Sequence, residues 1–113
     1  MNQSKEFTTI STEDQVLTLI NVFTVDPANQ QKLIGQLQKD TAEVIRKLPG
    51  WVSSSLHASL DGKTVVNYAQ WKTKEDWEAM VRNPEAKKRL DAMHQLVLSS
   101  SPHLYKVASV AHI

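Results

Sequence analysis

The chain of 113 residues contains no cysteine, three glycines, four prolines and 6% aromatic residues. Without cysteine it can form no disulfide, thiolate zinc site, iron–sulfur cluster or cysteine nucleophile. Three glycines are too few for a glycine-rich loop that holds phosphates. Thirteen basic and twelve acidic side chains give a net charge of +1, which provides no basic field for nucleic acid or anionic lipid. No apolar run reaches the roughly 18 residues of a membrane span. The sequence therefore predicts no nucleic-acid or membrane partner.

The length and the hydrophobic content of 41% fit one globular domain with its own core. Residues 1–14 are polar, with no apolar core or cleavage pattern of a signal peptide, so we expect a cytoplasmic protein. This segment is predicted to be a flexible arm that could become ordered against a partner. Residues 15–113 are predicted to form the single domain.

Within this domain, hydrophobic residues alternate between strand-like and helix-like spacing. The predicted strands are 16–25, 51–60, 64–72 and 103–113, and the predicted helices follow Pro27, Thr73 and Pro84, the last running to Leu98. This order predicts an α+β fold, the ferredoxin-like split β-α-β arrangement with one antiparallel sheet. Helices on one face leave the other face bare, yet the first strand is apolar on both sides. We therefore predict a homodimer.

Polar side chains interrupt the apolar face of two predicted strands. Asn21 shares its side of the first strand with apolar residues, and Asn67 and Trp71 share one side of the third. Buried amides are costly unless they form hydrogen bonds, so the two could hold an enolate oxygen or dioxygen. Alternatively, each amide satisfies backbone groups at an edge or bulge, and Trp71 is simply a core residue.

The histidines give no metal-ligating spacing, so no metal site is predicted. His94, on the last predicted helix, could face a pocket as a general base or hydrogen-bond donor, or could pair with Asp91 at the surface. Trp77 fits a core position on the short helix. Trp51 comes just after the turn at Pro49-Gly50, where a dimer contact is one interpretation.

From about residue 16 to the end, the chain resembles the antibiotic biosynthesis monooxygenases. Three segments carry the resemblance: Asn21-Val22-Phe23-Thr24-Val25, Leu48-Pro49-Gly50-Trp51-Val52, and the stretch 66–73 (VNYAQWKT) with Trp77 beyond it. The pair Asn67-x-x-x-Trp71 is the more specific part, because it resembles the subgroup that oxidises polyketide anthrones to quinones.

The resemblance implies a dimeric α+β barrel and oxygenation without cofactor, metal or flavin, with a small aromatic substrate and dioxygen as partners. It assigns catalytic roles to Asn21, Asn67 and Trp71: the amides bind the substrate oxygen or peroxide, and the indole grips the substrate. Substrate-binding positions are Phe23, Trp77, Leu90 and His94. Some members carry an arginine where His94 stands, and Arg89 is expected on another helix face.

The sequence leaves two alternative functions open. Haem-degrading relatives use a helix histidine to ligate iron, but the matching region here holds Leu90, with His94 one turn later. A binding module or a non-oxidative enzyme could also use the same dimeric barrel, since fold alone does not fix function.

Overall fold

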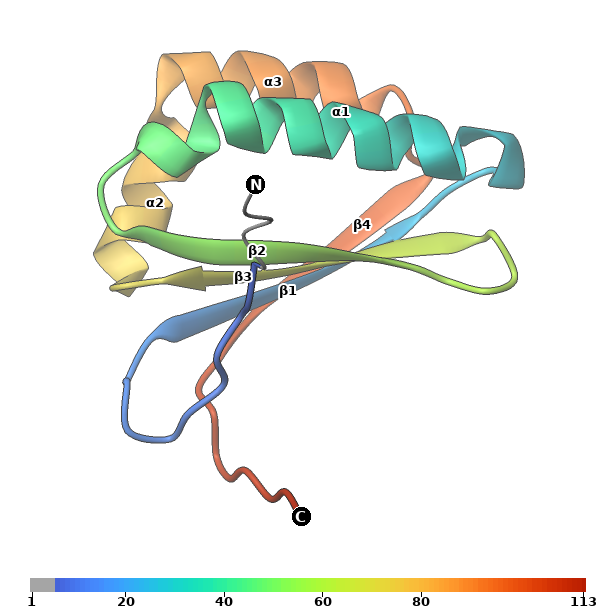
Figure 1. The fold of residues 1–113 in the computed structure, drawn as a ribbon. Helices are drawn as coiled ribbons and strands as arrows, with labels where there is room; N and C mark the ends of the chain where they lie inside the picture. Colours follow the sequence, from blue (N-terminus) through green and yellow to red (C-terminus); the bar gives the residue numbers. More distant parts are fainter. Residues whose placement is uncertain (1–5) are drawn as a thin grey trace, which may run out of the picture.

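The computed structural model describes residues 6–113, which form one four-stranded antiparallel sheet covered on one face by helices (Figure 1). The strand order is β2-β3-β1-β4, so β1 and β3 lie in the middle. The elements are β1 (Leu17–Thr24), α1 (Gln30–Glu43), β2 (Trp51–Ala58), β3 (Thr64–Trp71), α2 (Lys74–Arg82), α3 (Pro84–His94) and β4 (Ser99–Tyr105). This arrangement confirms the predicted ferredoxin-like α+β fold.

Side-chain caps begin the helices where the sequence predicts. Asp26 accepts the backbone N–H of Ala28 at 2.9 Å and starts a short 3₁₀ turn, Pro27–Asn29, that leads into α1. Thr73 accepts the N–H of Asp76 at 3.0 Å at the start of α2. Asn83 caps α3 by accepting two backbone N–H groups. Each cap satisfies donors that the first helical turn would otherwise leave unpaired.

Two predicted boundaries are wrong at the C-terminal end. Helix α3 ends at His94 instead of Leu98, and the last strand covers Ser99–Tyr105 instead of 103–113. The backbone N–H of Leu98 donates to the carbonyl of Thr24 at 2.8 Å, and the chain then pairs with β1. Because β4 is an edge strand, it tolerates Pro102, which lacks an N–H. Pairing with β1 therefore overrides a serine-rich composition that favours a loop.

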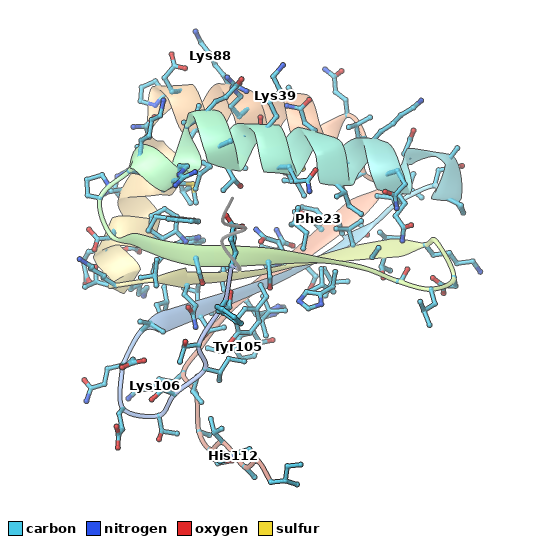
Figure 2. All side chains as sticks on the ribbon, viewed as in Figure 1. Phe23, Lys39, Lys88, Tyr105, Lys106 and His112 are labelled. Atoms are coloured by element: carbon cyan, nitrogen blue, oxygen red, sulfur yellow. The ribbon has the colours of Figure 1, made fainter. Side chains whose placement is uncertain are left out.

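The core lies between the sheet and the helices. The sheet contributes Phe23, Val65 and Trp71, each at most 2% exposed, and the helices contribute Leu33 and Met93. Figure 2 shows Phe23 pointing into this layer. The opposite face of β1 is partly open, since Val22 is 36% exposed. The sheet thus has one closed inner face and one partly open outer face.

The N-terminal segment contacts the sheet although residues 6–16 form no helix or strand. The side chain of Gln70, on the outer face of β3, donates to the carbonyl of Thr9 at 2.8 Å. The segment thus reaches the outer face, and the C-terminal tail leaves on the same side (Figure 1). Residues 1–5 of the predicted arm lie outside the described residues, and the domain boundary at residue 15 stays a prediction. None of the helices in residues 6–113 is long and apolar enough to cross a membrane.

Gly50 lies directly before β2, at a point where a side chain does not fit. Its φ is +83°, and a Cβ there would collide with the side chain of Asp76 in α2. We expect Gly50→Ala to lower the free energy of unfolding by about 1–3 kcal/mol, measured by urea denaturation. Gly35→Ala is the control: a Cβ there meets no atom within 4 Å, and the change should stabilise α1 by about 0.5–1 kcal/mol. Equal effects of the two substitutions would contradict this account.

Candidate active site

The two central strands bring Asn21 and Asn67 directly opposite each other. Antiparallel pairing aligns Asn21 with Asn67, between the pairs Leu19–Ala69 and Phe23–Val65. Directly opposed residues have Cβ atoms about 5 Å apart on the same face of a sheet. Leu19, Ala69 and Phe23 are buried under the helices, so the two amides lie in an apolar layer. The sheet thus forms one polar position in the middle of its inner face.

A β-bulge turns Trp51 toward the same layer. Trp51 pairs with Trp71 and Ser53 with Gln70, which leaves Val52 as the extra residue of β2. The bulge places Trp51 and Ser54 on the inner face, while Ser53 reaches Gln70 on the outer face at 2.7 Å. Regular alternation back from Ser53 would instead point Trp51 to the outer face. Bulges often re-aim side chains beside active sites.

A cavity of about 200 Å³ lies between these strands and the helices. Its volume is below the roughly 300–1,000 Å³ of most drug-sized ligand sites, which favours a small ligand. All seven side chains that the sequence proposes for the site line this cavity: Asn21, Phe23, Asn67, Trp71, Trp77, Leu90 and His94. The structure therefore brings together residues from β1, β3, α2 and α3, and their roles stay a prediction.

The two amides differ in their hydrogen bonds. The Asn21 side-chain oxygen accepts the backbone N–H of Ser101 in β4 at 3.1 Å, so this amide also supports the strand pairing. The Asn67 side-chain oxygen is buried and has no hydrogen-bond partner among residues 6–113. An unpaired buried carbonyl costs about 1–3 kcal/mol. Asn67 is thus the amide with unused bonding capacity.

The aromatic and imidazole groups form the wall of the cavity. Trp71 is 1% exposed and packs with Met80 of α2, so it is both a core residue and a wall of the cavity. His94 is the last residue of α3 and reaches the cavity. Asp91, its possible surface partner, instead forms an ion pair with Lys87 at 3.0 Å. The wall is therefore mostly aromatic, with an imidazole at the C-terminal end of α3.

An ion pair that sequence reasoning missed also lines the cavity. Arg89 donates to Asp40 of α1 at 3.1 Å and to Glu43 at 2.8 Å. Hydrogen bonds to Glu43 and then to Asp40 raise the pKa of Arg89, which keeps it cationic. The expectation that Arg89 faces elsewhere is wrong. Its spacing from Ala86 and Met93, which are buried, carried the signal, because residues three and four apart share a helix face.

A second hollow of about 610 Å³ lies between α1, β2 and the segment from Glu6 to Thr8. It shares Thr41, Trp51 and Ser54 with the smaller cavity, and none of the predicted site residues lines it. Residues 6–113 contain no group of three or more histidine, aspartate or glutamate side chains that could hold a metal ion.

The sequence matches the family model described as antibiotic biosynthesis monooxygenase over residues 16–91, and the chain belongs to this family. It is 43% identical over 83 residues to the tetracenomycin-F1 monooxygenase of Streptomyces glaucescens, an alignment that covers 74% of each chain. Because the chain belongs to this family and is similar to this relative, it is a monooxygenase.

Two solved structures share its fold. One is a monooxygenase from the gene ActVA-Orf6 of Streptomyces coelicolor in complex with the ligand nanaomycin D: TM-score 0.81, 28% identity, covering 88% of this chain and 94% of that one. The other is an anthrone oxidase-like protein: TM-score 0.79, 35% identity, covering 88% of this chain and 42% of that one.

The unpaired carbonyl of Asn67 should lower the free energy of unfolding of the protein. We expect Asn67→Leu to raise the free energy of unfolding by about 1 kcal/mol, because an apolar group of similar shape removes the desolvation cost. Thr18→Val is the matched control, since the Thr18 hydroxyl is also buried without a partner but lies on the outer side of β1. Thermal unfolding of both variants tests this, and a destabilised Asn67→Leu would contradict it.

Proposed function

We propose that this protein is a cofactor-independent monooxygenase that oxidises a polycyclic aromatic or quinol-like substrate with dioxygen. The observation that carries the proposal is the opposed amide pair, Asn21 and Asn67, in a cavity walled by Trp71. The relative at 43% identity is a tetracenomycin-F1 monooxygenase, and a structure at 35% identity is named anthrone oxidase-like. Both names point to fused-ring aromatic substrates.

The chemistry can be balanced without a further electron donor. An anthrone or phenol loses a proton to give a carbanion, which passes one electron to dioxygen. The resulting radicals combine to a peroxide, which loses water and leaves a new carbonyl. One oxygen atom enters the product and the other leaves as water, and the oxidation of the substrate carbon supplies all four electrons that dioxygen takes up. The protein needs only to align the reactants and stabilise the anion.

Each lining residue then has a role in this scheme. The amide N–H groups of Asn21 and Asn67 are suited to donate to the substrate oxygen or the peroxide. Trp71 and Trp77 are suited to stack on a planar ring. His94 lines the cavity, and its imidazole is suited to accept the substrate proton. The apolar remainder, which includes Phe23 and Leu90, excludes water and strengthens these interactions.

Oxygen consumption with dithranol tests the reaction. We expect the purified, chelator-treated protein to consume oxygen and form the quinone. Asn67→Ala should lower kcat roughly 100-fold, as loss of an oxyanion donor does. Trp71→Phe should raise KM more than it lowers kcat, since it keeps an aromatic wall. The control variant Thr18→Val should have the same kcat and KM as the parent protein. Variants as active as the parent would remove these residues from the mechanism, and a Soret shift with haemin would favour the haem-degrading alternative.

We also propose that the protein is a homodimer, formed through the outer face of the sheet. On that face Ile20 opposes Tyr68 and Val22 opposes Val66, so four apolar or aromatic side chains form a patch. Tyr105 lies on the same side, away from Lys39 and Lys88 on the helical surface (Figure 2). A second copy would cover this patch. We further propose that the enzyme acts in the cytoplasm.

Light scattering after size exclusion tests the dimer. The wild-type protein should have the mass of a dimer at micromolar concentration, and Val22→Lys should produce monomers because it buries a charge in the interface. Lys88→Glu, on the exposed side of α3, is the control and should remain dimeric. A monomeric wild-type protein would refute the proposal.

A further inference from the structure

The cavity at the amide pair, called the inner cavity below, is adjacent to the larger hollow beside β2, called the outer hollow. Three residues line both spaces: Thr41 of α1, and Trp51 and Ser54 of β2. Trp51 is half-buried, so part of its ring remains accessible although its Nε1 atom is buried. Thr41 and Ser54 have small side chains. The boundary between the two spaces thus consists of two small side chains and one indole.

The inner cavity is too small for a molecule of three or four fused rings. Its volume is about 200 Å³, and an apolar cavity of about 150 Å³ takes one benzene molecule. The space beside Asn67 and Trp71 therefore holds one or two rings. The outer hollow, with a volume of about 610 Å³, has room for more. A polycyclic substrate placed at the amide pair must extend beyond the inner cavity.

The two spaces differ in the chemistry of their linings. Apolar side chains such as Phe23 and Met80 make up most of the inner lining, whereas more than half of the residues around the outer hollow are polar. Arg46 and Glu6 both line the outer hollow, so its lining does not carry charge of one sign. Such a lining suits hydroxyl and carbonyl groups, which donate and accept hydrogen bonds. An apolar ring would thus lie inside and an oxygen-bearing ring outside.

The chain before β1 forms part of the rim of the outer hollow. Residues 6–8 line the hollow, while the next residue, Thr9, is bound by Gln70 on the outer face of the sheet. The segment therefore passes around β2, which is an edge strand (Figure 1). Phe7 is 80% exposed there, so most of its ring is available to a ligand. An aromatic ring at a rim is suited to stack on a planar molecule.

We propose that the outer hollow is the second part of the substrate site and binds the far, oxygen-bearing rings of a fused-ring aromatic substrate. The two parts join between Thr41 and Ser54, whose small side chains leave a passage, so these two are specificity residues. The proposal rests on the proposed function for the aromatic nature of the ligand. It adds the length of the ligand and the place of its far end.

Two aromatic ketones that do not react with dioxygen test this: α-tetralone with two rings and 1-hydroxyanthraquinone with three. Thr41→Trp narrows the passage. We expect it to weaken binding of 1-hydroxyanthraquinone about tenfold or more and to change binding of α-tetralone less than about twofold. Calorimetric titration of the full-length protein measures both affinities.

Lys39→Trp is the matched control for this variant. It adds the same ring at an exposed position of α1 that lines neither space. This variant should bind both ketones as tightly as the parent protein does.

The wild-type protein provides a second measurement that does not depend on a variant folding. Phe7 and Ala42 line the outer hollow and not the inner cavity. Bound 1-hydroxyanthraquinone should give nuclear Overhauser effects to the Phe7 ring or the Ala42 methyl group. Bound α-tetralone, which fits within the inner cavity, should give none to either residue.

Three results would overturn the proposal. The first is equal weakening of both ketones by Thr41→Trp, and the second is the absence of any Overhauser effect from 1-hydroxyanthraquinone to Phe7 or Ala42. The third is selective loss of 1-hydroxyanthraquinone binding in Ser100→Trp but not in Thr41→Trp, because Ser100 lines the inner cavity at β4, the opposite edge of the sheet.

Failure of this proposal can be distinguished from failure of the proposed function. If Thr41→Trp selectively excludes 1-hydroxyanthraquinone but the parent protein does not oxidise dithranol, the proposed function fails and the two-part site stands. If dithranol is oxidised and Thr41→Trp binds both ketones as the parent does, the two-part site fails and the oxygenase stands.

Discussion

The register of the central strand pair, β1 with β3, is the constraint on which the rest of the structure depends. It sets Asn21 against Asn67 and surrounds them with the buried pairs of the inner face. A slip of β1 by one residue against β3 would move Asn21 to the outer face, away from Asn67, and would expose Phe23. The same pairing that builds the core therefore builds the polar position in it. Helices α1, α2 and α3 then close the cavity above this position.

Much of this arrangement could be predicted because it follows from local patterns. Alternation places Asn67 and Trp71 on one side of a strand, and Asp26, Thr73 and Asn83 are the residues that begin helices. The family resemblance supplied the roles, which spacing alone does not give. The residues proposed for the site therefore line one cavity, although no local pattern shows that β1 and β3 are neighbours.

The features that could not be predicted depend on tertiary contacts. A bulge has no clear sequence signal, so the inward position of Trp51 is visible only from its pairing with Trp71. The ion pair between Arg89 and Asp40 joins two helices far apart in sequence. The strand Ser99–Tyr105 forms because β1 has a free edge, despite its three serines and Pro102. The face of Arg89 is the exception, because its helical spacing from Ala86 and Met93 indicates that it points toward the sheet.

The central position of the amide pair links the chemistry to the order in which the chain folds. Asn21 is synthesised early, but its partner strand β3 follows only after α1, β2 and the hairpin at Gly62. Pairing between distant segments must overcome the entropy of closing the intervening loop, so it forms slowly compared with local structure. A nascent chain that has folded its first helix still lacks half of the amide pair. The polar position on the inner face is thus complete only after β1 and β3 have paired across the sheet.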